Sequence, residues 1–343
     1  MGAHRSYACR PCRVILMTTR ILKPTPENIA LCARHMRDGG LVAFPTETVY
    51  ALGAVATNAD AVRRVFDVKG RPLDKALIVA VSDSADIASV ARTVPKKARI
   101  LIEKFMPGAL TVLLDKADCI PSVVTAGSPS VAVRIPDNPV ALRLIELVGA
   151  PVVVPSANTS DKPSPTLGKH VLDDLDGKIA YILDGGPSKI GIESTIVDVR
   201  EDPPVIVRGG GVSADRIAAE IGEVVFKRET PKQSSAYSPC ADVYFSAYYD
   251  GMAKSICARY DETTARGGSV VILCLEKNRD RYGDRAVFSV GDDYADYAHN
   301  LFALLRRADA ERFDTVIAEG VPTVGIGASL VNRLIKISGG KII

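Results

Sequence analysis

The stretch "NADAVRRVFDVKGRPLDKALIVAV" (residues 58–81) joins an amphipathic segment to an apolar run through a joint rich in cations. Val62, Val65 and Phe66 recur at helical spacing, and Asn58 is suited to cap the helix that starts there. The run "ALIVAV" (76–81) has the length and composition of a buried strand. The sequence therefore predicts a helix, a basic turn and a strand in succession, which is a building unit of α/β folds.

The same alternation continues on both sides of this unit. The stretch "PTPENIALCARHMRDGG" (24–40) predicts a helix that Thr25 can cap, that Pro26 suits in its first turn, and that a Gly-Gly pair ends. Further helices are predicted at 95–106 and 138–148, and further strands near 41–45, 110–115, 130–135, 151–154, 179–184, 194–199 and 205–208. Such alternation predicts an α/β or α+β class.

The pattern breaks near residue 226. The segment "KRETPKQSSAYSPC" (227–240) is polar, contains two prolines and lacks an apolar period, so it is typical of a linker. Beyond it, predicted strands at 269–275 and 314–320 and helices at 293–308 and 323–336 indicate a smaller α/β unit. We therefore expect an N-terminal extension (1–18), a large domain (19–226), a linker (227–241) and a small C-terminal domain (242–343).

Composition excludes several classes of protein. The 343 residues are 47% hydrophobic and 24% charged with a net charge of +3, which is ordinary for a two-domain globular chain and too weakly basic to indicate nucleic-acid binding alone. No apolar run approaches the roughly 20 residues that span a bilayer, so we expect no membrane partner. Seven scattered cysteines, including a lone Cys9-x-x-Cys12 pair, predict a reducing, cytoplasmic location. We interpret residues 1–18 as a disordered extension, with Met17 as a candidate start.

Motifs for covalent or zinc-dependent hydrolysis are missing. The sequence contains no G-x-S-x-G, H-E-x-x-H or Walker loop, and its four histidines do not cluster at ligand spacing. What remains is a set of hydroxyls, amides and cations in Pro- and Gly-rich joints. Chemistry that uses positioning and charge is therefore favoured over chemistry that uses a protein nucleophile.

The first two candidate stretches have functional side chains two residues apart. Thr46 and Thr48 in "FPTETVYALG" (44–53) would face the same way on an extended chain, although β-propensity and turn chemistry explain them equally simply. Lys69 and Arg71 flank Gly70, which lets a ligand approach the backbone. The alternative there is a solvated basic turn.

The other candidates follow predicted strands. Ser156 and Asn158 in "VVVPSANTSDKPSPT" (152–166) open a hydroxyl-rich loop, or else a plain Pro/Ser turn. Arg208 ends a strand and runs into three glycines, where an anion can meet a guanidinium and backbone N–H groups. Arg134 lies in an apolar strand and should meet a carboxylate, a phosphate or an interior acid, the alternative being a structural ion pair with an Asp or Glu. Together they suit a polyanion with a small acid beside it.

In this order and spacing, the motifs resemble the threonylcarbamoyl-AMP synthases of the YrdC-like family, in their two-domain form. The resemblance covers roughly residues 22–227 and rests on "FPTETVYALG", "VFDVKGRPLDKALIV", "VTAGSPSVAVRIP", "VPSANTSDKPSPT" and "GIESTIVDV". It implies a twisted mixed sheet with flanking helices and an open cavity, plus a smaller Rossmann-like α/β domain. It also implies that L-threonine, bicarbonate and ATP are joined to give threonylcarbamoyl-AMP and pyrophosphate.

The resemblance also implies roles for individual residues. Catalytic positions are Lys69, Arg71, Ser156 and Asn158. ATP-binding positions are these four together with Lys75, Ser130, Ser164, Arg208 and Tyr237, the last in a linker that lies over the active site. Threonine-binding positions are Thr46, Thr48, Ala80, Arg134, Val154 and Ser194, with Arg134 taking the substrate carboxylate.

The resemblance implies further partners. Mg²⁺ is expected to come with ATP, and neither a protein metal cage nor a tightly bound organic cofactor is expected. A downstream complex would transfer the threonylcarbamoyl group to tRNA, with a weak RNA contact by this protein. Two alternatives stay open at this point: a related carbamoyl-adenylate chemistry that uses carbamoyl phosphate, and a non-enzymatic RNA-binding module.

Overall fold

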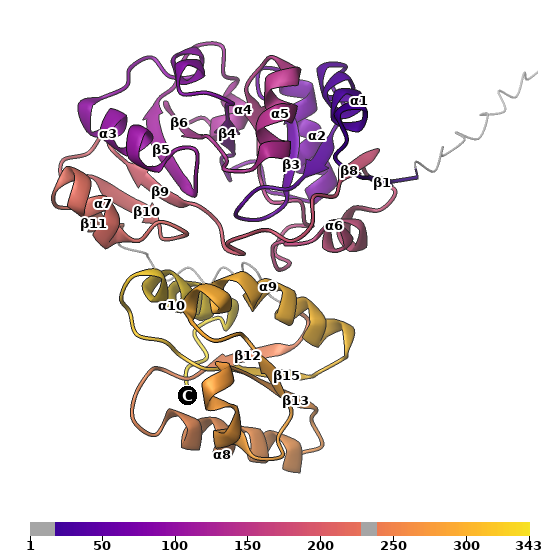
Figure 1. The fold of residues 1–343 in the computed structure, drawn as a ribbon, viewed down its shortest axis with the longest axis vertical. Coiled ribbons are helices and arrows are strands. Elements are labelled where there is room, and N and C mark those ends of the chain that lie inside the picture. The colour runs from indigo at the N-terminus through magenta and orange to yellow at the C-terminus, as the bar shows by residue number, and fades with distance from the viewer. Residues whose placement is uncertain (1–17, 228–238) are drawn as a thin grey trace, which may run out of the picture.

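The computed structural model describes residues 18–227 and 239–343. Two domains follow each other along the chain, a larger one at the N-terminus and a smaller one at the C-terminus (Figure 1). The predicted N-terminal extension, apart from residue 18, lies outside the described residues, as do the Cys9/Cys12 pair and Met17. Residues 228–238 of the predicted linker also lie outside them, and so does Tyr237.

Within the described ranges, the larger domain is built on one sheet of eleven strands, in the order β1-β8-β2-β3-β7-β4-β6-β5-β9-β10-β11. Parallel and antiparallel pairs mix: β4 lies parallel to β6, whereas β5 and β6 are antiparallel. The strands are β1 (Arg20–Leu22), β2 (Val42–Phe44), β3 (Ala51–Val55), β4 (Ile78–Ala80), β5 (Leu110–Asp115), β6 (Ser130–Arg134), β7 (Val152–Val153), β8 (Tyr181–Leu183), β9 (Thr195–Asp198), β10 (Val205–Arg208) and β11 (Val225–Phe226). The expected mixed sheet is confirmed.

Helices cover both faces of this sheet. Consecutive residues of a strand point to opposite faces, so Val79 joins the apolar core under one set of helices and Ala80 joins the other. Helices α1 and α5 pack on the Ala80 side. The helical elements are α1 (Pro26–Arg37), α2 (Ala59–Lys69), η1 (Ala85–Ser89), α3 (Lys96–Phe105), α4 (Ser122–Thr125), α5 (Pro139–Val148), α6 (Gly168–Leu175) and α7 (Ala214–Ile221).

The joint after α2 is fixed by its caps. The Asn58 side chain accepts hydrogen bonds from the backbone N–H groups of Asp60 and Ala61, as the sequence predicts. At the other end Gly70 adopts a left-handed conformation with φ 59°, and its N–H bonds back to the helix. This reversal ends the helix immediately after Lys69 and turns the chain toward β4.

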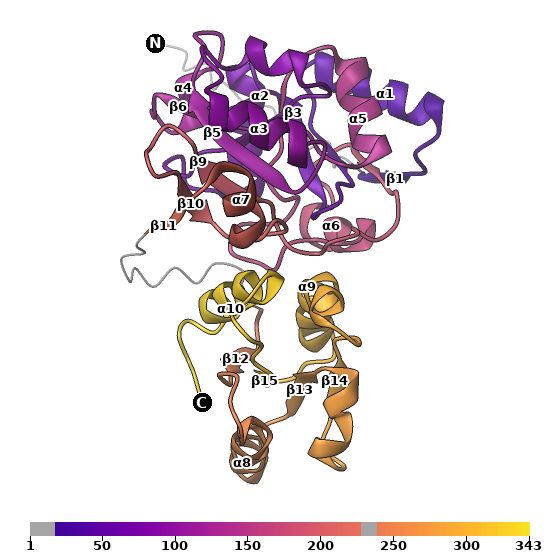
Figure 2. The same ribbon diagram turned by 60° about the vertical axis from the view of Figure 1, so that its left-hand side comes forward.

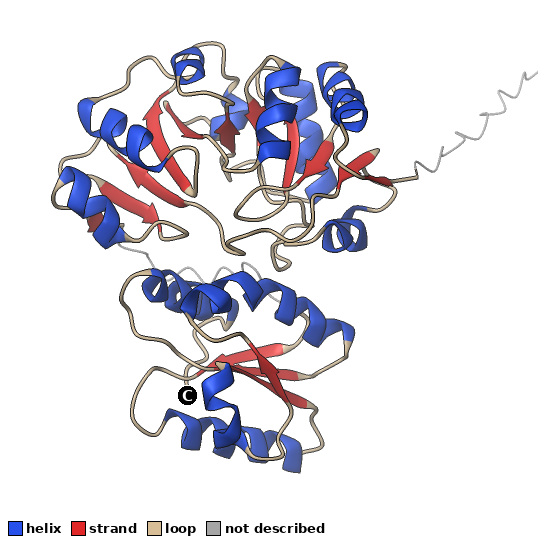
Figure 3. Ribbon diagram, viewed as in Figure 1, coloured by secondary structure: helices blue, strands red, loops and turns tan. Residues whose placement is uncertain are grey.

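The smaller domain has one parallel sheet in the order β12-β15-β13-β14. Its elements are β12 (Asp242–Phe245), α8 (Met252–Ala265), β13 (Val270–Cys274), η2 (Glu276–Tyr282), β14 (Val287–Ser289), α9 (Tyr294–Ala310), β15 (Thr315–Ala318) and α10 (Ile326–Ile337). Helix α8 covers one face of the sheet, and α9 and α10 cover the other (Figure 3). A smaller α/β domain with helices on both faces of a parallel sheet is thus confirmed.

Helices α9 and α10 lie between the small sheet and the larger domain in both views (Figures 1 and 2). Val49 and Ile192 of the larger domain belong to the same apolar cluster as the residues of α9 and α10. No helix within the described ranges combines the length and apolar character needed to cross a bilayer.

Candidate active site

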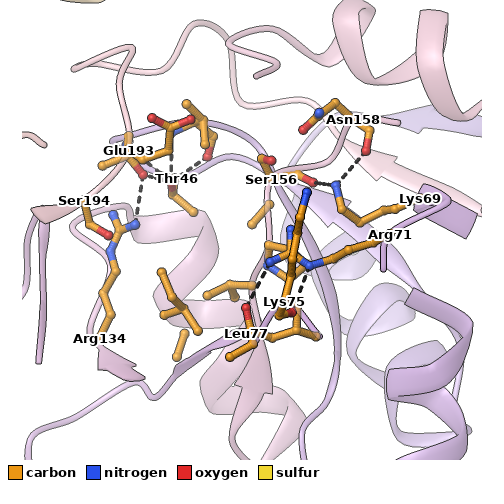
Figure 4. A pocket seen from close by; sticks show the side chains of 18 of the residues that line it. Thr46, Lys69, Arg71, Lys75, Leu77, Arg134, Ser156, Asn158, Glu193 and Ser194 are labelled. Carbon is orange, nitrogen blue, oxygen red and sulfur yellow. Dashed lines mark hydrogen bonds between the residues drawn. The ribbon is translucent and has the colours of Figure 1, made fainter. Parts of the chain in front are cut away.

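A cavity of about 330 Å³ lies where several strand ends and loops of the larger domain meet. It brings together the separate stretches that the sequence singles out (Figure 4). The predicted site residues that line it are Thr46, Thr48, Lys69, Arg71, Lys75, Ala80, Arg134, Val154, Ser156, Asn158, Ser194 and Arg208. Cations and hydroxyls from distant parts of the chain therefore share one hollow.

One end of the cavity is built around Arg134, which ends strand β6. Only 5% of this residue is exposed. Its guanidinium pairs with the carboxylate of Glu47, and Nη1 donates to Thr48 Oγ1 at 2.9 Å. The Oγ1 atoms of Thr46 and Thr48 are also 2.9 Å apart. The sequence left a ligand carboxylate and a protein carboxylate open as partners of Arg134; the structure shows the protein partner, while Arg134 also lines the cavity.

Ser194 and Arg208 extend this end. Arg208 Nη2 donates to the carbonyl oxygen of Ser194 at 2.8 Å and to Ser194 Oγ at 3.1 Å. Ser194 Oγ also lies 2.8 Å from Thr111 Oγ1. The side chain of Arg208 thereby fixes the short segment before β9, and both residues face the same hollow.

Lys69 lies at the other end of the cavity and is almost completely buried. Its ammonium donates to the carbonyl oxygens of Ser156 and Asn158, the latter at 2.6 Å. Burial, with the nearby charge of Arg71, lowers the pKa of Lys69 from 10.5 to about 7. The ammonium is thus engaged by the Ser156–Asn158 loop, a positioning contact that the sequence did not indicate.

Arg71 and Lys75 are more open to solvent. Arg71 Nε donates to the carbonyl of Lys75 at 3.1 Å, and Nη2 donates to the carbonyl of Ala76 at 3.0 Å. Lys75 Nζ lies 3.7 Å from Asp161 Oδ1, and both side chains are about half exposed, 44% and 54%. This end therefore presents cations on a solvent-facing loop.

Two predicted ATP-binding serines do not line the cavity in this structure. Ser130 starts β6, at the opposite end of the strand from Arg134, and its Oγ lies 2.8 Å from Ser128 Oγ. Ser164 is fully buried, and its Oγ donates to Glu193 Oε1 at 2.7 Å. Their predicted contacts with ATP stay predictions.

Sequence reasoning missed the carboxylates of the site. Asp161 and Glu193 line the cavity, and Glu47 pairs with Arg134. All three lie inside stretches that the sequence analysis quotes. An arginine in an apolar strand does signal that some carboxylate must be near it. Nothing in the spacing, however, identifies which one.

The carboxylates that line the cavity do not form a metal cage. Asp161 pairs with Lys75, and Glu193 pairs with Arg333. Within the described ranges, no group of three histidines, cysteines or carboxylates is placed to hold a metal ion.

The chain matches two family descriptions. Residues 34–210 match the Sua5/YciO/YrdC family, described as "Telomere recombination". Residues 218–339 match the family described as "Threonylcarbamoyl-AMP synthase, C-terminal domain". The first match covers β2 to β10 of the larger sheet, and the second covers β11 together with all four strands of the smaller sheet.

Curated relatives and solved structures resemble the chain over most of its length. Threonylcarbamoyl-AMP synthases from Pyrococcus abyssi and Bacillus subtilis are each 40% identical to it, and the alignments cover 92% and 94% of this chain and 95% and 96% of theirs. The crystal structure of P. abyssi Sua5 complexed with L-threonine superposes with a TM-score of 0.88 at 38% identity, covering 95% of this chain and 98% of that one.

Proposed function

We propose, on the premise that the chain belongs to the Sua5/YciO/YrdC family, that it is an L-threonylcarbamoyl-AMP synthase. The reaction joins L-threonine, bicarbonate and ATP to give threonylcarbamoyl-AMP and pyrophosphate. One observation carries the proposal: a single cavity holds Arg134, Arg71, Lys69 and Arg208 together with a row of hydroxyls. Such a cavity suits an amino-acid carboxylate at one end and phosphates at the other.

The buried end is the one that fits L-threonine. Arg134 has a second hydrogen on each of Nη1 and Nη2 for a carboxylate, in addition to those that Thr48 and Glu47 accept. The walls there include Val154 and Ala80, which are small and apolar enough to contact a methyl group. A relative from P. abyssi forms a complex with L-threonine, which supports L-threonine as the amino acid that this chain binds.

The open end fits the triphosphate. Arg71 and Lys75 are cations on a loop, and the Ser156–Asn158 loop lies beside them (Figure 4). In the reaction, the amine of threonine and bicarbonate form a carbamate with loss of water. A carbamate oxygen then attacks the α-phosphate, the bond between the α-phosphorus and the bridging oxygen breaks, and pyrophosphate leaves. The cations stabilise the charge that develops on the phosphate oxygens.

The protein contributes position and charge to this chemistry, with no covalent intermediate on a side chain. Mg²⁺ enters as part of the MgATP substrate, where it shields the phosphates. The acylated adenylate would then pass to a complex that modifies tRNA, and a weak RNA contact would assist that transfer. The five cysteines within the described residues are free thiols, as is typical of a protein in the reducing cytoplasm, the location that we propose.

The proposal is tested by incubating the protein with MgATP, bicarbonate and one amino acid at a time. We expect pyrophosphate and an adenylate product with L-threonine, and neither product when threonine or bicarbonate is omitted. Turnover that needs carbamoyl phosphate in place of threonine would favour the related carbamoyl-adenylate chemistry. Tight RNA binding without threonine-dependent pyrophosphate release would favour the RNA-binding module.

A further inference from the structure

Two arginines of the smaller domain reach across to the back of the cavity wall. Arg306 of α9 donates through Nε to the carbonyl of Pro163 at 3.1 Å, and its Nη2 lies 2.8 Å from Asp174 Oδ2. Arg333 of α10 donates through Nε to Glu193 Oε2 at 2.8 Å and through Nη2 to the carbonyl of Gly209 at 3.1 Å. Arg333 is completely buried, although arginine is among the residues least often found inside proteins.

Glu193 links this arginine to the cavity. It lines the hollow, precedes Ser194, and uses its two carboxylate oxygens for different partners: Ser164 on one side and Arg333 on the other. Burial acts to raise the pKa of Glu193, but the charges of Arg333 and Arg208 and the hydrogen bond from Ser164 outweigh it and lower the pKa. Arg333 is thus one of the groups that keep this buried carboxylate ionised.

Two segments of the cavity wall are pressed against α9 and α10. A Cβ placed on Gly191 would lie 2.4 Å from the carbonyl oxygen of His299 in α9, and a Cβ on Gly209 would lie 3.2 Å from Ser329 Oγ in α10. Ser329 Oγ of α10 donates to the carbonyl of Gly210 at 2.9 Å. Gly191 thus leaves no room for a side chain against α9, and α10 bonds directly to the turn at Gly210, so a shift of either helix would disturb these segments.

We propose that Arg333 is a positioning residue for adenylate synthesis, which acts through Glu193 to hold Ser194 and the Gly209–Gly211 turn in place around the amino-acid end of the cavity. The inference rests on the proposed function and goes beyond it, because it makes the smaller domain a working part of the site. The pair puts a side chain of the smaller domain in direct contact with a residue that lines the cavity.

The test compares Arg333→Met, Arg333→Lys and the control Arg307→Met. Arg307 lies on α9 and pairs with Glu311 at the surface, so its loss removes an arginine of the same domain without touching the cavity wall. Steady-state pyrophosphate release gives kcat and the KM values for ATP and threonine, and calorimetry gives the affinity for L-threonine. Thermal unfolding reports on the fold of each variant.

We expect Arg333→Met to lower kcat/KM for threonine roughly 100-fold, the scale of loss that a 1 Å misplacement in an active site causes. Most of this loss should appear in the KM for threonine and in the calorimetric affinity. Arg333→Lys keeps the charge beside Glu193 and should recover at least a tenth of the wild-type value. Arg307→Met should behave like the wild type.

The double variant Glu193→Gln/Arg333→Met covers the case in which Arg333→Met does not fold. It leaves no buried charge without a partner, so its unfolding temperature should return toward the wild-type value while the KM for threonine stays raised. Wild-type kinetics in either Arg333→Met or the double variant would overturn the inference. A wild-type protein without threonine-dependent pyrophosphate release would instead overturn the proposed function, and the inference with it.

Discussion

The two ends of the cavity are built in opposite ways. At the end proposed for the amino acid, Arg134, Glu47 and Thr48 are almost entirely buried and bonded to one another. At the end proposed for phosphate, Lys75 and Asp161 are about half exposed and 3.7 Å apart. A rigid, pre-formed end loses little conformational entropy when it binds a small ligand, whereas mobile cations can follow a flexible polyphosphate. The difference shows how one cavity can discriminate at one end and adapt at the other.

The positions of these residues in the fold explain the contrast. Arg134 ends β6, which is paired with β4 on one side and β5 on the other. Arg71 and Lys75 lie in the loop between α2 and β4, which starts at the left-handed Gly70. Two ladders of hydrogen bonds hold the backbone of a strand inside a sheet, whereas connecting loops at the surface are generally more mobile.

The largest effect is expected from breaking the rigid end with Arg134→Met. This change leaves Glu47 as a buried charge without its partner, so the free energy of unfolding should fall by about 3–5 kcal/mol. Binding of L-threonine should be lost in calorimetry, and urea unfolding measures the stability. The surface change Arg143→Met, which removes an exposed pair with Glu146, is the control. Unchanged stability and threonine affinity would show that this end is not pre-formed.

The open end is tested by Arg71→Ala. Loss of one group that stabilises transition-state charge typically lowers turnover roughly 100- to 1000-fold, so pyrophosphate release should fall by that factor. The free energy of unfolding should change by less than about 1 kcal/mol, because a half-buried loop side chain contributes little to the fold. Arg63→Ala, on the exposed face of α2, should leave both quantities unaltered. Near-normal turnover in Arg71→Ala would refute the assignment of this end to phosphate.

Lys69 extends the comparison of the two ends of the cavity, because it is a buried cation next to the more exposed Arg71 and Lys75. Burial, helped by Arg71, lowers its pKa from 10.5 to about 7. Between those two values the unfolded chain keeps a proton that the folded protein releases, so the contribution of Lys69 to the free energy of unfolding rises with pH. The free energy of unfolding of the wild type should therefore increase relative to that of Lys69→Met from pH 7 to pH 10.

Urea unfolding at intervals between pH 7 and pH 10 measures this relative free energy of unfolding. Substitution of an exposed lysine, Lys104→Met, is the control for the loss of a lysine. A difference that stays constant with pH would mean that Lys69 remains charged in its contacts with the two carbonyls.

The smallest effect is expected from Lys75→Met. Its pair with Asp161 is exposed, and such pairs contribute about 0–1 kcal/mol, so the unfolding temperature should barely move. The KM for ATP should rise a few-fold at low ionic strength, and the difference should shrink as added salt screens the charge. A salt-independent change in KM would indicate that Lys75 acts through the shape of its loop and not through its charge.

Much of the larger domain follows from local patterns in the sequence. The helix over 59–69 has its cap at Asn58 and its end at Gly70, and both signals are visible in the sequence. The missed elements include α6 and α8, which lack a capping side chain, and β3 (Ala51–Val55), which contains Gly53. The reason for that glycine is tertiary, because a Cβ there would lie 2.5 Å from the ring of Phe44.

The candidate site, like the fold, has parts that local sequence patterns predict and parts that depend on distant contacts. The cations and hydroxyls of the cavity lie in motifs whose residues are near in sequence, so the pattern predicts them as groups. The pair between Glu193 and Arg333 joins residues 140 positions apart. The periodicity of a single sequence carries no information about which distant side chains meet. The contribution of the smaller domain to the cavity wall could therefore not be predicted from the sequence.

Side chains of α9 and α10 reach main-chain oxygens on the larger domain. On α9, the side chains of Arg306 and His299 form hydrogen bonds with the carbonyl oxygens of Pro163 and Lys189, respectively. On α10, the side chains of Arg333 and Ser329 form hydrogen bonds with the carbonyl oxygens of Gly209 and Gly210, respectively. Every amino acid presents the same carbonyl group, so the contacts at Pro163 and Lys189 do not depend on a functional group of the residue that supplies the oxygen. The pairs of Arg306 with Asp174 and of Arg333 with Glu193, in contrast, require a carboxylate on the larger domain.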